Sequence, residues 1–483
     1  MIFILLESIT FCKVVVGSNT DMAYDITLTN DKGYIITGYT NSFALLGNMY
    51  VIKLDSLGNL KWNKVMSGVG SSVIEDYEGN YVIAGGKRVI KLDPNGNILW
   101  NRYLAILTQS SLSGDTVIDA NFKSIIQAKD SGYFIIGSAK GYYEPDSPYY
   151  NLLIVKLNKD GNLLYHKLIL NTAGAGDLYG FDAYRTDDKG FIVAGYENPL
   201  GHFIVMKYDS NGIFQFGREI PIYASIQHRR LITQVGKYYY FAQHNNFGKM
   251  DSSGNVLWVN ILSSLEITSI VPTYDKGYAV VGNFPLLLNP QIFIIKFDSL
   301  DQIQWSRLIG TTSFSSSAIQ TPDSGFVIVG YNSSDYTGND IFIVKLDKDG
   351  NVCSPCNSGS FSANIDNVSF ASYIQYEFPF TGNVVSDTTY NVGSGGNLYP
   401  ICESSSLVEG NTSDFNVYIS CNKIVFKPKN YVSYKINIYT ADGKVVFSRK
   451  LRGDYILDIS NFKKGSYILE LNNIFRKRFV KVE

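Results

Sequence analysis

The chain of 483 residues exceeds what one hydrophobic core usually serves, so it holds either several domains or an array of repeats. Its 42 Lys and Arg residues balance 43 Asp and Glu residues, which argues against nucleic acid as a partner. Hydrophobic residues make up 45% of the chain, too much for a disordered protein, and no apolar run approaches the roughly 20 residues of a membrane-spanning helix.

The first residues contain only part of the pattern of a secretory signal. Residues 1–6 are apolar, but Glu7 follows directly. Neither a basic leading segment nor a small-residue cleavage pattern is present. We therefore expect the translated start to lie upstream of Met1.

One sequence unit recurs seven times before residue 357. Its first half reads Asp-x-Gly-aromatic, then alternating apolar residues, then Gly, and it begins at Asp31, Asp130, Asp188, Asp275 and Asp323, with looser copies around Gly79 and Gly236. Its second half reads apolar-Lys-apolar-Asp-x-x-Gly-Asn-x-x-Trp in residues 52–62 and 90–100, and recurs with variations at residues 155–165, 206–216, 249–258, 295–305 and 344–351.

Each unit is predicted to form four short antiparallel strands. In the first copy these are residues 25–29, 34–39, 50–54 and 60–66, whose polarity alternates with period two. The Asp and Gly residues between them supply backbone-bonding side chains and positive φ, as tight hairpins require. Seven units of roughly 40–50 residues with four strands each predict an all-β fold, a seven-bladed β-propeller.

The ring is predicted to close through the N-terminus. All Trp residues of the chain share one repeat position, where we expect the rings to pack between adjacent blades: Trp62, Trp100, Trp258 and Trp305, with Tyr165 and Phe216 in copies three and four. The seventh copy stops before its fourth strand, and residues 9–17 match residues 61–66 with Phe11 on the Trp position. The N-terminal strand should therefore complete the last blade and remove two sheet edges.

Two further regions follow the predicted propeller of residues 1–356. Residues 357–410 are rich in Ser, Asn, Gly and Thr, which is the composition of a linker, and the alternation in residues 370–380 is compatible with a local hairpin. Residues 411–483 contain five or six short alternating strands, which predict a small β-sandwich. A general adhesive or structural β-domain is the alternative interpretation of that last region.

The end of the chain carries several ordered motifs. They are a hairpin at Gly443, an Asp-x-Ser-x-Phe turn from Asp458, a Lys-Gly-x-Tyr strand from Lys464 and a basic final strand. Together with the repeats, this region resembles secreted bacterial propeller-like proteins that end in a type IX secretion sorting domain. In that family the domain is a small immunoglobulin-like β-sandwich, which is recognised by the outer-membrane export machinery and then removed or exchanged for a surface anchor. The resemblance implies a secreted or outer-membrane surface-attached protein with the export machinery as a partner.

The five Cys residues are more consistent with disulfides than with a metal centre. Only Cys353 and Cys356 form a closely spaced pair, whereas a zinc site needs four converging ligands. Export favours disulfide formation. Because Cys12 lies on the strand that completes the last blade, a bridge to Cys353 or Cys356 is geometrically reasonable, with Cys402 as a further candidate. The sequence leaves the connectivity open.

The sequence predicts no catalytic residue, cofactor or metal site. Residues 158–162 and 347–351 resemble the start of a calcium loop, but neither has a Glu at the twelfth position, so both are interpreted as hairpin turns. No nucleophile elbow, paired carboxylates outside the repeat or His flanked by acids is recognisable. The Gly-Asn-x-x-Trp pattern is similar to quinone-dependent propeller enzymes only superficially.

The connections between second and third strands vary most in length, and in a propeller they gather on one face. Apolar side chains on these connections suggest that this face binds a protein or a glycan. They are Phe43, Leu45, Tyr142, Tyr143, Tyr149, Tyr150, Phe284, Leu287 and Tyr336. The alternative is that these side chains fold back over their own blades.

The sequence thus predicts a secreted or surface-displayed, non-enzymatic binding or adhesion propeller. One alternative is a secreted hydrolase or quinone-dependent enzyme on the same ring, and another is a structural surface component. Convergent carboxylates at the mouth of the central channel would favour the enzyme, and an aromatic face without them favours binding.

Overall fold

The structure of the protein is a computed structural model. It describes residues 10–43, 47–104, 106–110, 114–118, 120–140, 149–169, 176–223, 230–284, 290–310, 313–334, 338–352, 356–363, 365–367, 378–380, 385–386, 398–403, 415–419, 423–428, 433–440, 443–452, 455–459, 461–463, 465–472 and 475–481. Every regular element among these residues is a β-strand, as the sequence predicts.

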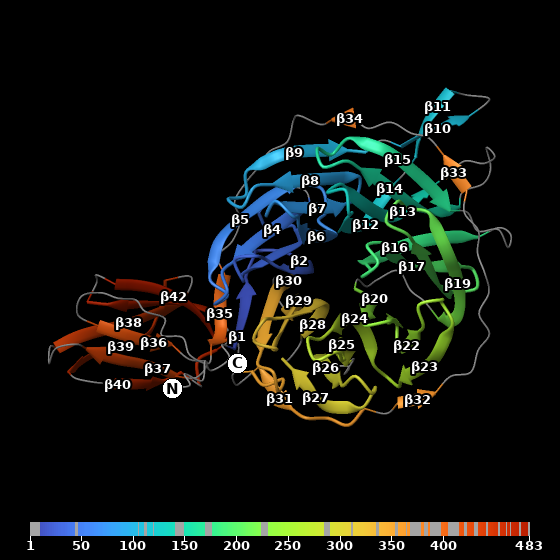
Figure 1. Cartoon of the computed structure of the whole chain (residues 1–483). Helices are drawn as coiled ribbons and strands as arrows, with labels where there is room; N and C mark the ends of the chain where they lie inside the picture. Colours follow the sequence, from blue (N-terminus) through green and yellow to red (C-terminus); the bar gives the residue numbers. More distant parts are fainter. Residues whose placement is uncertain are drawn as a thin grey trace, which may run out of the picture.

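Seven antiparallel sheets surround a central axis and form a seven-bladed β-propeller (Figure 1). From the axis outward, blade 1 contains β2 (Asp21–Leu28), β3 (Tyr34–Thr40), β4 (Asn48–Leu54) and β5 (Leu60–Ser67). Blade 2 contains β6 (Ser72–Glu75), β7 (Tyr81–Gly85), β8 (Arg88–Leu92) and β9 (Ile98–Tyr103). Blade 3 contains β12 (Ala120–Gln127), β13 (Tyr133–Lys140), β14 (Tyr150–Leu157) and β15 (Leu163–Ile169), and a separate hairpin of β10 (Ile106–Ser110) and β11 (Gly114–Ile118) precedes it.

The remaining blades repeat this order. Blade 4 contains β16 (Asp177–Arg185), β17 (Phe191–Asn198), β18 (His202–Tyr208) and β19 (Phe214–Tyr223). Blade 5 contains β20 (Ile232–Val235), β21 (Tyr238–Gln243), β22 (Asn246–Met250) and β23 (Val256–Leu262). Blade 6 contains β24 (Glu266–Pro272), β25 (Tyr278–Phe284), β26 (Gln291–Phe297) and β27 (Ile303–Ile309). Blade 7 combines β28 (Ser313–Gln320), β29 (Phe326–Ser334) and β30 (Gly338–Leu346) with the N-terminal β1 (Phe11–Val15).

A buried lysine ties the two hairpins of a blade together. In blade 1 the Lys53 ammonium group lies 2.8 Å from the Asp31 carboxylate, and it donates a 3.0 Å hydrogen bond to the carbonyl of Leu54. Four other blades contain the same pair: Lys156 with Asp130, Lys207 with Asp188, Lys296 with Asp275 and Lys345 with Asp323. Burying an unpaired ammonium group costs several kcal/mol, so the two halves of the repeat depend on each other.

Blade 5 obtains its carboxylate from the neighbouring blade. Its first turn lacks the Asp, and Lys249 instead pairs with Asp301 of blade 6 at 2.8 Å. Asp301 stands where the other blades have the turn Gly, and it adopts the positive φ of 63° that this position requires. Burial alone would lower the pKa of Lys249, but the hydrogen bonds and charge interactions with Asp301 and Tyr240 together outweigh burial, and the net shift of the pKa is upward.

The aromatic repeat position joins each blade to the next. The Trp62 indole donates a 2.9 Å hydrogen bond to the Pro94 carbonyl, in the outer turn of blade 2. A Cβ atom at Gly254 would lie 2.6 Å from the Phe216 ring of the preceding blade, so this turn accepts only Gly against the ring. The rings therefore pack between blades, as predicted from their shared position.

The N-terminal strand closes the ring in the same way. In every blade the aromatic residue faces the buried Lys across the outer strand pair, and β1 places Phe11 opposite Lys345 in that register. Phe11 is fully buried, and a Cβ atom at Gly58 of blade 1 would lie 2.6 Å from its ring. Phe11 thus stands in for the Trp of the seventh repeat, which confirms the predicted closure.

Within residues 357–403, for which the sequence predicts a linker, five described segments are strands. Each adds a fifth strand to a blade: β31 (Asn357–Gly359) to blade 6, β32 (Ile365–Asn367) to blade 5, β33 (Phe378–Phe380) to blade 3, β34 (Val385–Ser386) to blade 2 and β35 (Leu398–Glu403) to blade 7. Four of these strands span only two or three residues, too few for an alternating pattern to be recognised in the sequence. They pair with outer edges that would otherwise be open.

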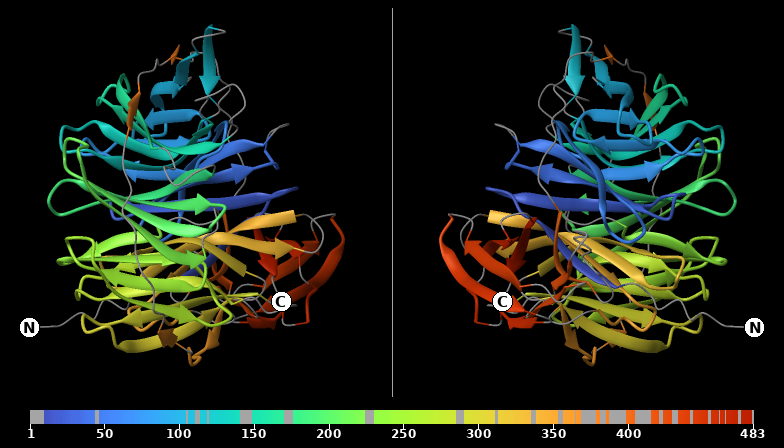
Figure 2. Two further views of the ribbon diagram at one scale, coloured as in Figure 1. Left: turned by 90° about the vertical axis from the view of Figure 1, so that its right-hand side faces the viewer. Right: turned by 90° about the vertical axis from the view of Figure 1, so that its left-hand side faces the viewer.

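The C-terminal region forms a small sandwich of two sheets beside blade 7 (Figures 1 and 2). One sheet contains β36 (Phe415–Ile419), β37 (Lys423–Pro428) and β40 (Tyr455–Asp458). The other contains β38 (Ser433–Thr440), β39 (Val445–Arg452), β41 (Gly465–Leu471) and β42 (Phe475–Lys481). Its core includes Ile424, Tyr434, Ile436 and Leu469, on alternate positions of facing strands.

The pairing of Lys249 with Asp301 can be tested by a rescue. Asp301→Gly restores the consensus turn residue but leaves a lysine that is 10% exposed without its carboxylate, so we expect a loss on the order of 3 kcal/mol in the free energy of unfolding. Adding Lys249→Met should recover most of that loss, because the buried charge disappears. Chemical denaturation measures both variants.

The control is Lys348→Met, which breaks the exposed pair of Lys348 and Asp349 and should change stability little. An Asp301→Gly protein as stable as the wild type would contradict the assignment.

Candidate functional site

The innermost strands of the seven blades line a central channel. Five of these strands carry a β-bulge at one repeat position, where one extra residue is inserted. The extra residues are Tyr24, Lys123, Phe181, Thr268 and Ser316. Tyr24, Lys123 and Ser316 line the channel, whereas Phe181 and Thr268 are buried. The bulge therefore recurs in the repeat, while the residue that it adds and the surroundings of that residue differ from blade to blade.

One ion pair divides the channel. Arg230, directly before blade 5, donates a 2.9 Å hydrogen bond from Nε to Asp25 of blade 1, and its Nη2 donates to the Ile26 carbonyl. The same carboxylate accepts hydrogen bonds from Ser317 of blade 7 and from Ser72 of blade 2, both at 3.0 Å. Asp25 is 3% exposed, so it serves to connect four blades rather than to meet a ligand.

Asp182 makes the equivalent connection between blades 4 and 5. Its carboxylate accepts hydrogen bonds from the backbone N–H groups of Leu231 (2.7 Å) and Ile232 (3.1 Å). Burial raises the pKa of Asp182 to about 6, although these backbone hydrogen bonds lower it. Because of this raised pKa, the free energy of unfolding of the ring should depend on pH through Asp182.

The cavity on one side of Arg230 has a volume of about 550 Å³ and is called the turn-side cavity. It lies where the Asp-x-Gly turns gather and is lined by the ends of the innermost strands, including Glu75, Gln127, Arg185, Tyr274 and Gln320. Burial raises the pKa of Glu75, whose carboxylate accepts a hydrogen bond from the Asn30 N–H.

The cavity on the other side is larger, about 900 Å³, and is called the loop-side cavity. It is lined by the beginnings of innermost strands and the ends of second strands, so it opens on the face that carries the connections between second and third strands. Its wall contains five half-buried aromatic residues: Tyr24, Tyr150, Tyr179, Phe314 and Tyr331. Glu266 is the one carboxylate among the described residues that line it, beside Lys87, Lys123, Asn121 and Asn283.

Two stacks hold the aromatic wall in place. Tyr179 stacks on Tyr150 with ring centres 5.2 Å apart and on Tyr196 at 5.6 Å, and Phe314 stacks on Tyr331 at 5.0 Å. The Tyr179 hydroxyl donates a 3.0 Å hydrogen bond to Asp177. The ring contacts therefore preorganise the aromatic wall, and Tyr179 lies between Tyr150 and Tyr196.

The residues predicted for the binding face have different positions. Tyr150 lines the loop-side cavity and Tyr149 precedes it, half-buried. Phe43 instead packs on Tyr50, and Phe284 contacts Phe361, so both fold back over the blades. The others lie outside the described residues: Leu45, Tyr142, Tyr143, Leu287 and Tyr336.

Sequence reasoning did not select Tyr24, Tyr179, Phe314 and Tyr331, because it searched the loops and these residues lie on strands. Tyr331 directly follows the Gly that ends the first repeat motif, and Tyr196 has the same place in blade 4. This variable position after a Gly that recurs in six of the seven copies is a signal that could have located the wall of the cavity.

A disulfide joins Cys12 on β1 to Cys356, across a sequence separation of 344 residues. Cys402 lies on β35 opposite Cys12 in the strand register. Cys353 and Cys421 lie outside the described residues. The N-terminal strand is thus fixed covalently as well as by strand pairing on both sides.

The C-terminal domain agrees with a known family. Residues 412–482 match the family described as the secretion system C-terminal sorting domain. The fold and this match define a β-propeller protein with a type IX sorting domain at its C-terminus. Such a domain indicates a protein that is secreted or attached to the cell surface. The described residues contain no helix long and apolar enough to cross a membrane.

Solved structures with propeller folds are only distantly similar. A protein of unknown function from Bacteroides caccae has 10% sequence identity and a TM-score of 0.36, and the match covers 68% of this chain and 94% of that one. A regucalcin from Agrobacterium tumefaciens, described as a calcium-binding protein, has 10% identity and a TM-score of 0.36, with 71% and 96% covered. Similarity at this level carries no conclusion about function. No curated protein sequence is significantly similar to the chain.

The raised pKa of Asp182 gives a pH-dependent prediction. The folded pKa of about 6 lies above the ordinary 3.8, so ionisation opposes folding. The free energy of unfolding should fall by on the order of 2 kcal/mol between about pH 4 and pH 6 because of this group, and stay level above. Asp182→Asn should lack this decrease, since the amide oxygen can still accept from Leu231 and Ile232.

Denaturation curves at several pH values compare Asp182→Asn with the wild type and with Asp187→Asn, an exposed carboxylate that should retain the wild-type slope. Parallel pH profiles for the wild type and Asp182→Asn would show that the Asp182 carboxyl is not perturbed.

Proposed function

We propose that the propeller is a surface-displayed carbohydrate-binding protein and that the loop-side cavity is its binding site. The observation that carries this proposal is the wall of half-buried, stacked tyrosine and phenylalanine rings around a cavity of about 900 Å³. Aromatic faces bind the apolar C–H faces of sugar rings, while Asn121, Asn283 and Glu266 offer hydrogen bonds for hydroxyl groups.

A binding function has more support than an enzymatic one. A glycoside hydrolase generally needs two carboxyl groups about 5–10 Å apart on either side of the scissile bond. Glu266 is the single carboxylate among the described residues of the loop-side cavity wall. On the turn side, Asp25 and Asp182 are held by hydrogen bonds between blades, which supports a structural role for both.

The sorting domain supports a binding site that faces the outside of the cell. The sorting domain indicates export, and the propeller supplies a rigid concave face for a ligand outside the cell. We infer that the protein binds a polysaccharide of the cell surface or of the surrounding medium.

A glycan-array screen of the full chain, followed by calorimetry with the best oligosaccharide, tests this proposal. Tyr24→Ala and Tyr331→Ala should each weaken binding about tenfold or more, because each removes a ring from the cavity wall. The matched control is Tyr274→Ala, which removes an aromatic ring of 62% exposure at the turn-side cavity and should leave affinity unchanged.

The proposal fails if no glycan binds, or if Tyr24→Ala and Tyr331→Ala bind as tightly as the control. Thermal denaturation of all three variants separates loss of the site from loss of the fold.

A further inference from the structure

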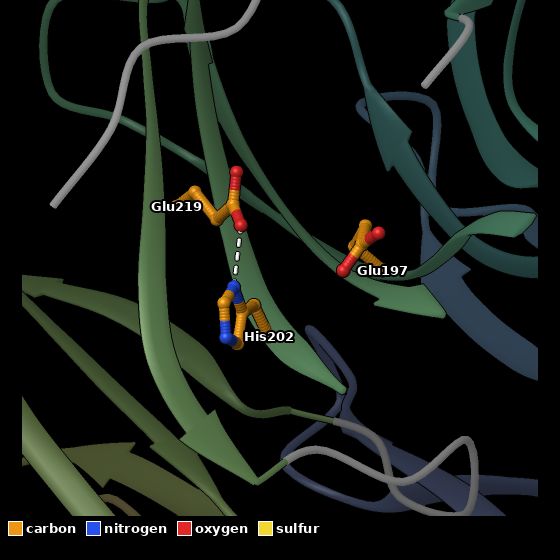
Figure 3. Close-up of side chains that lie close together, drawn as sticks. All are labelled: Glu197, His202 and Glu219. Atoms are coloured by element: carbon orange, nitrogen blue, oxygen red, sulfur yellow. Dashed lines mark hydrogen bonds and ion pairs between the residues drawn. The ribbon is translucent and has the colours of Figure 1, made fainter. Parts of the chain in front are cut away.

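Three side chains that could ligate a metal ion come together in blade 4 (Figure 3). Glu197 is the penultimate residue of β17, His202 begins β18 and Glu219 lies on β19. One potential ligand atom from each residue lies within 4.8 Å of the other two. None of these residues belongs to the channel or to either cavity described above.

The strand register explains why the three side chains share one face. Glu197 is directly opposite His202, and Glu219 is opposite Ile204, two residues further along the strand that carries His202. Alternate residues of a strand point to the same side of the sheet. The three side chains therefore project to the same side of the sheet from three neighbouring strands. Because these strands are paired by backbone hydrogen bonds, the positions of the three residues are fixed by the sheet.

These three side chains are more buried than acidic and His side chains on a solvated surface usually are. Glu197 is 3% exposed, the Glu219 side chain is 12% exposed and that of His202 is 21% exposed. His202 Nδ1 is hydrogen-bonded to the Glu219 carboxylate. Two carboxylates brought this close out of water repel each other and lose hydration, and both costs fall when a cation lies between them.

The same face packs against blade 3. Val193 and Ile204, which share the face with the cluster, belong to one hydrophobic core with Ile136 and Leu152 of blade 3. A bound ion would thus lie at the edge of the interface between two blades and stabilise it.

The ligand set indicates the class of ion. Zinc ligands lie about 2.0–2.2 Å from a tetrahedrally coordinated ion, so neighbouring ligand atoms are about 3.4 Å apart. The three ligand atoms lie within 4.8 Å of one another, and side-chain rotations that shorten their separations by up to about 1.4 Å would produce this geometry. One imidazole with two carboxylates suits a divalent transition metal such as Zn²⁺ or Mn²⁺, whereas Ca²⁺ prefers six to eight oxygen ligands.

We propose that Glu197, His202 and Glu219 form a binding site for one divalent transition-metal ion, with Zn²⁺ as the preferred candidate. Three protein ligands leave at least one coordination position for water. Sequence reasoning looked for Cys pairs and Asp-rich loops, and it missed this site because the ligands are separated along the chain and meet only through strand pairing.

The test uses the full chain after dialysis against a chelator. Titration calorimetry with ZnCl₂ should show one ion bound per chain, and thermal denaturation should show a Tm rise of several degrees at a hundredfold excess over Kd. MnCl₂ should act more weakly in the same way, and CaCl₂ and MgCl₂ should have little effect.

Two variants connect the effect to these residues. His202→Ala and Glu197→Gln should each lower zinc affinity about tenfold or more and abolish the Tm rise. Without metal, Glu197→Gln should be at least as stable as the wild type, because it removes one of two adjacent carboxylates. This reversal of the stability order separates metal binding from a general loss of structure.

Asp187→Asn, an exposed carboxylate of the same blade, is the matched control and should bind zinc as the wild type does. The proposal is overturned if wild-type protein shows no zinc binding at millimolar concentration. It is also overturned if His202→Ala and Glu197→Gln retain the full Tm rise, which would place the zinc elsewhere on the chain.

Discussion

The structure depends on closing the ring between its first and last blades. A propeller of separate sheets has an open outer edge wherever a blade lacks its fourth strand, and such an edge can pair with other chains. Here β1 fills that place in blade 7, with Phe11 opposite Lys345, as each aromatic residue stands opposite a buried lysine in the other blades. The strand is further held by the Cys12–Cys356 disulfide and by β35 on its outer side. Closure therefore combines burial, hydrogen bonding and a covalent bond.

Within this closed ring, each blade meets the next through a small set of contacts. The buried Lys and its carboxylate fix the two hairpins of a blade, and the aromatic ring packs on the turn of the following blade. Blade 5 keeps this arrangement although its own carboxylate is missing, because Asp301 of blade 6 supplies one at the turn position. With the frame fixed in this way, several bulge residues and residues after the repeat Gly differ between blades and contribute to the wall of the loop-side cavity.

Much of this fold could be predicted from the sequence, because it is carried by repetition. The number of blades follows from the recurring Asp-x-Gly and Lys-x-Asp motifs, and the role of Phe11 follows from its alignment with the Trp position. The outer strands β31 to β34 could not be predicted, since segments of two or three residues have no period and pair only because the blades offer edges.

The candidate sites were predicted less well. Tyr150 was selected from its loop, but Tyr24, Phe314 and Tyr331 reach the loop-side cavity from strands, where an apolar residue is ordinarily attributed to the core. Glu197, His202 and Glu219 are adjacent only because three strands pair in one register. Contacts of that kind depend on tertiary structure, which no local pattern encodes.

Hydrogen exchange of the N-terminal strand tests the closure of the ring most directly. In oxidised protein, the amides of residues 11–15 should exchange as slowly as those of the core strand β29, because β1 can open only when the whole ring unfolds. Fast exchange of residues 11–15 while β29 remains protected would contradict the account.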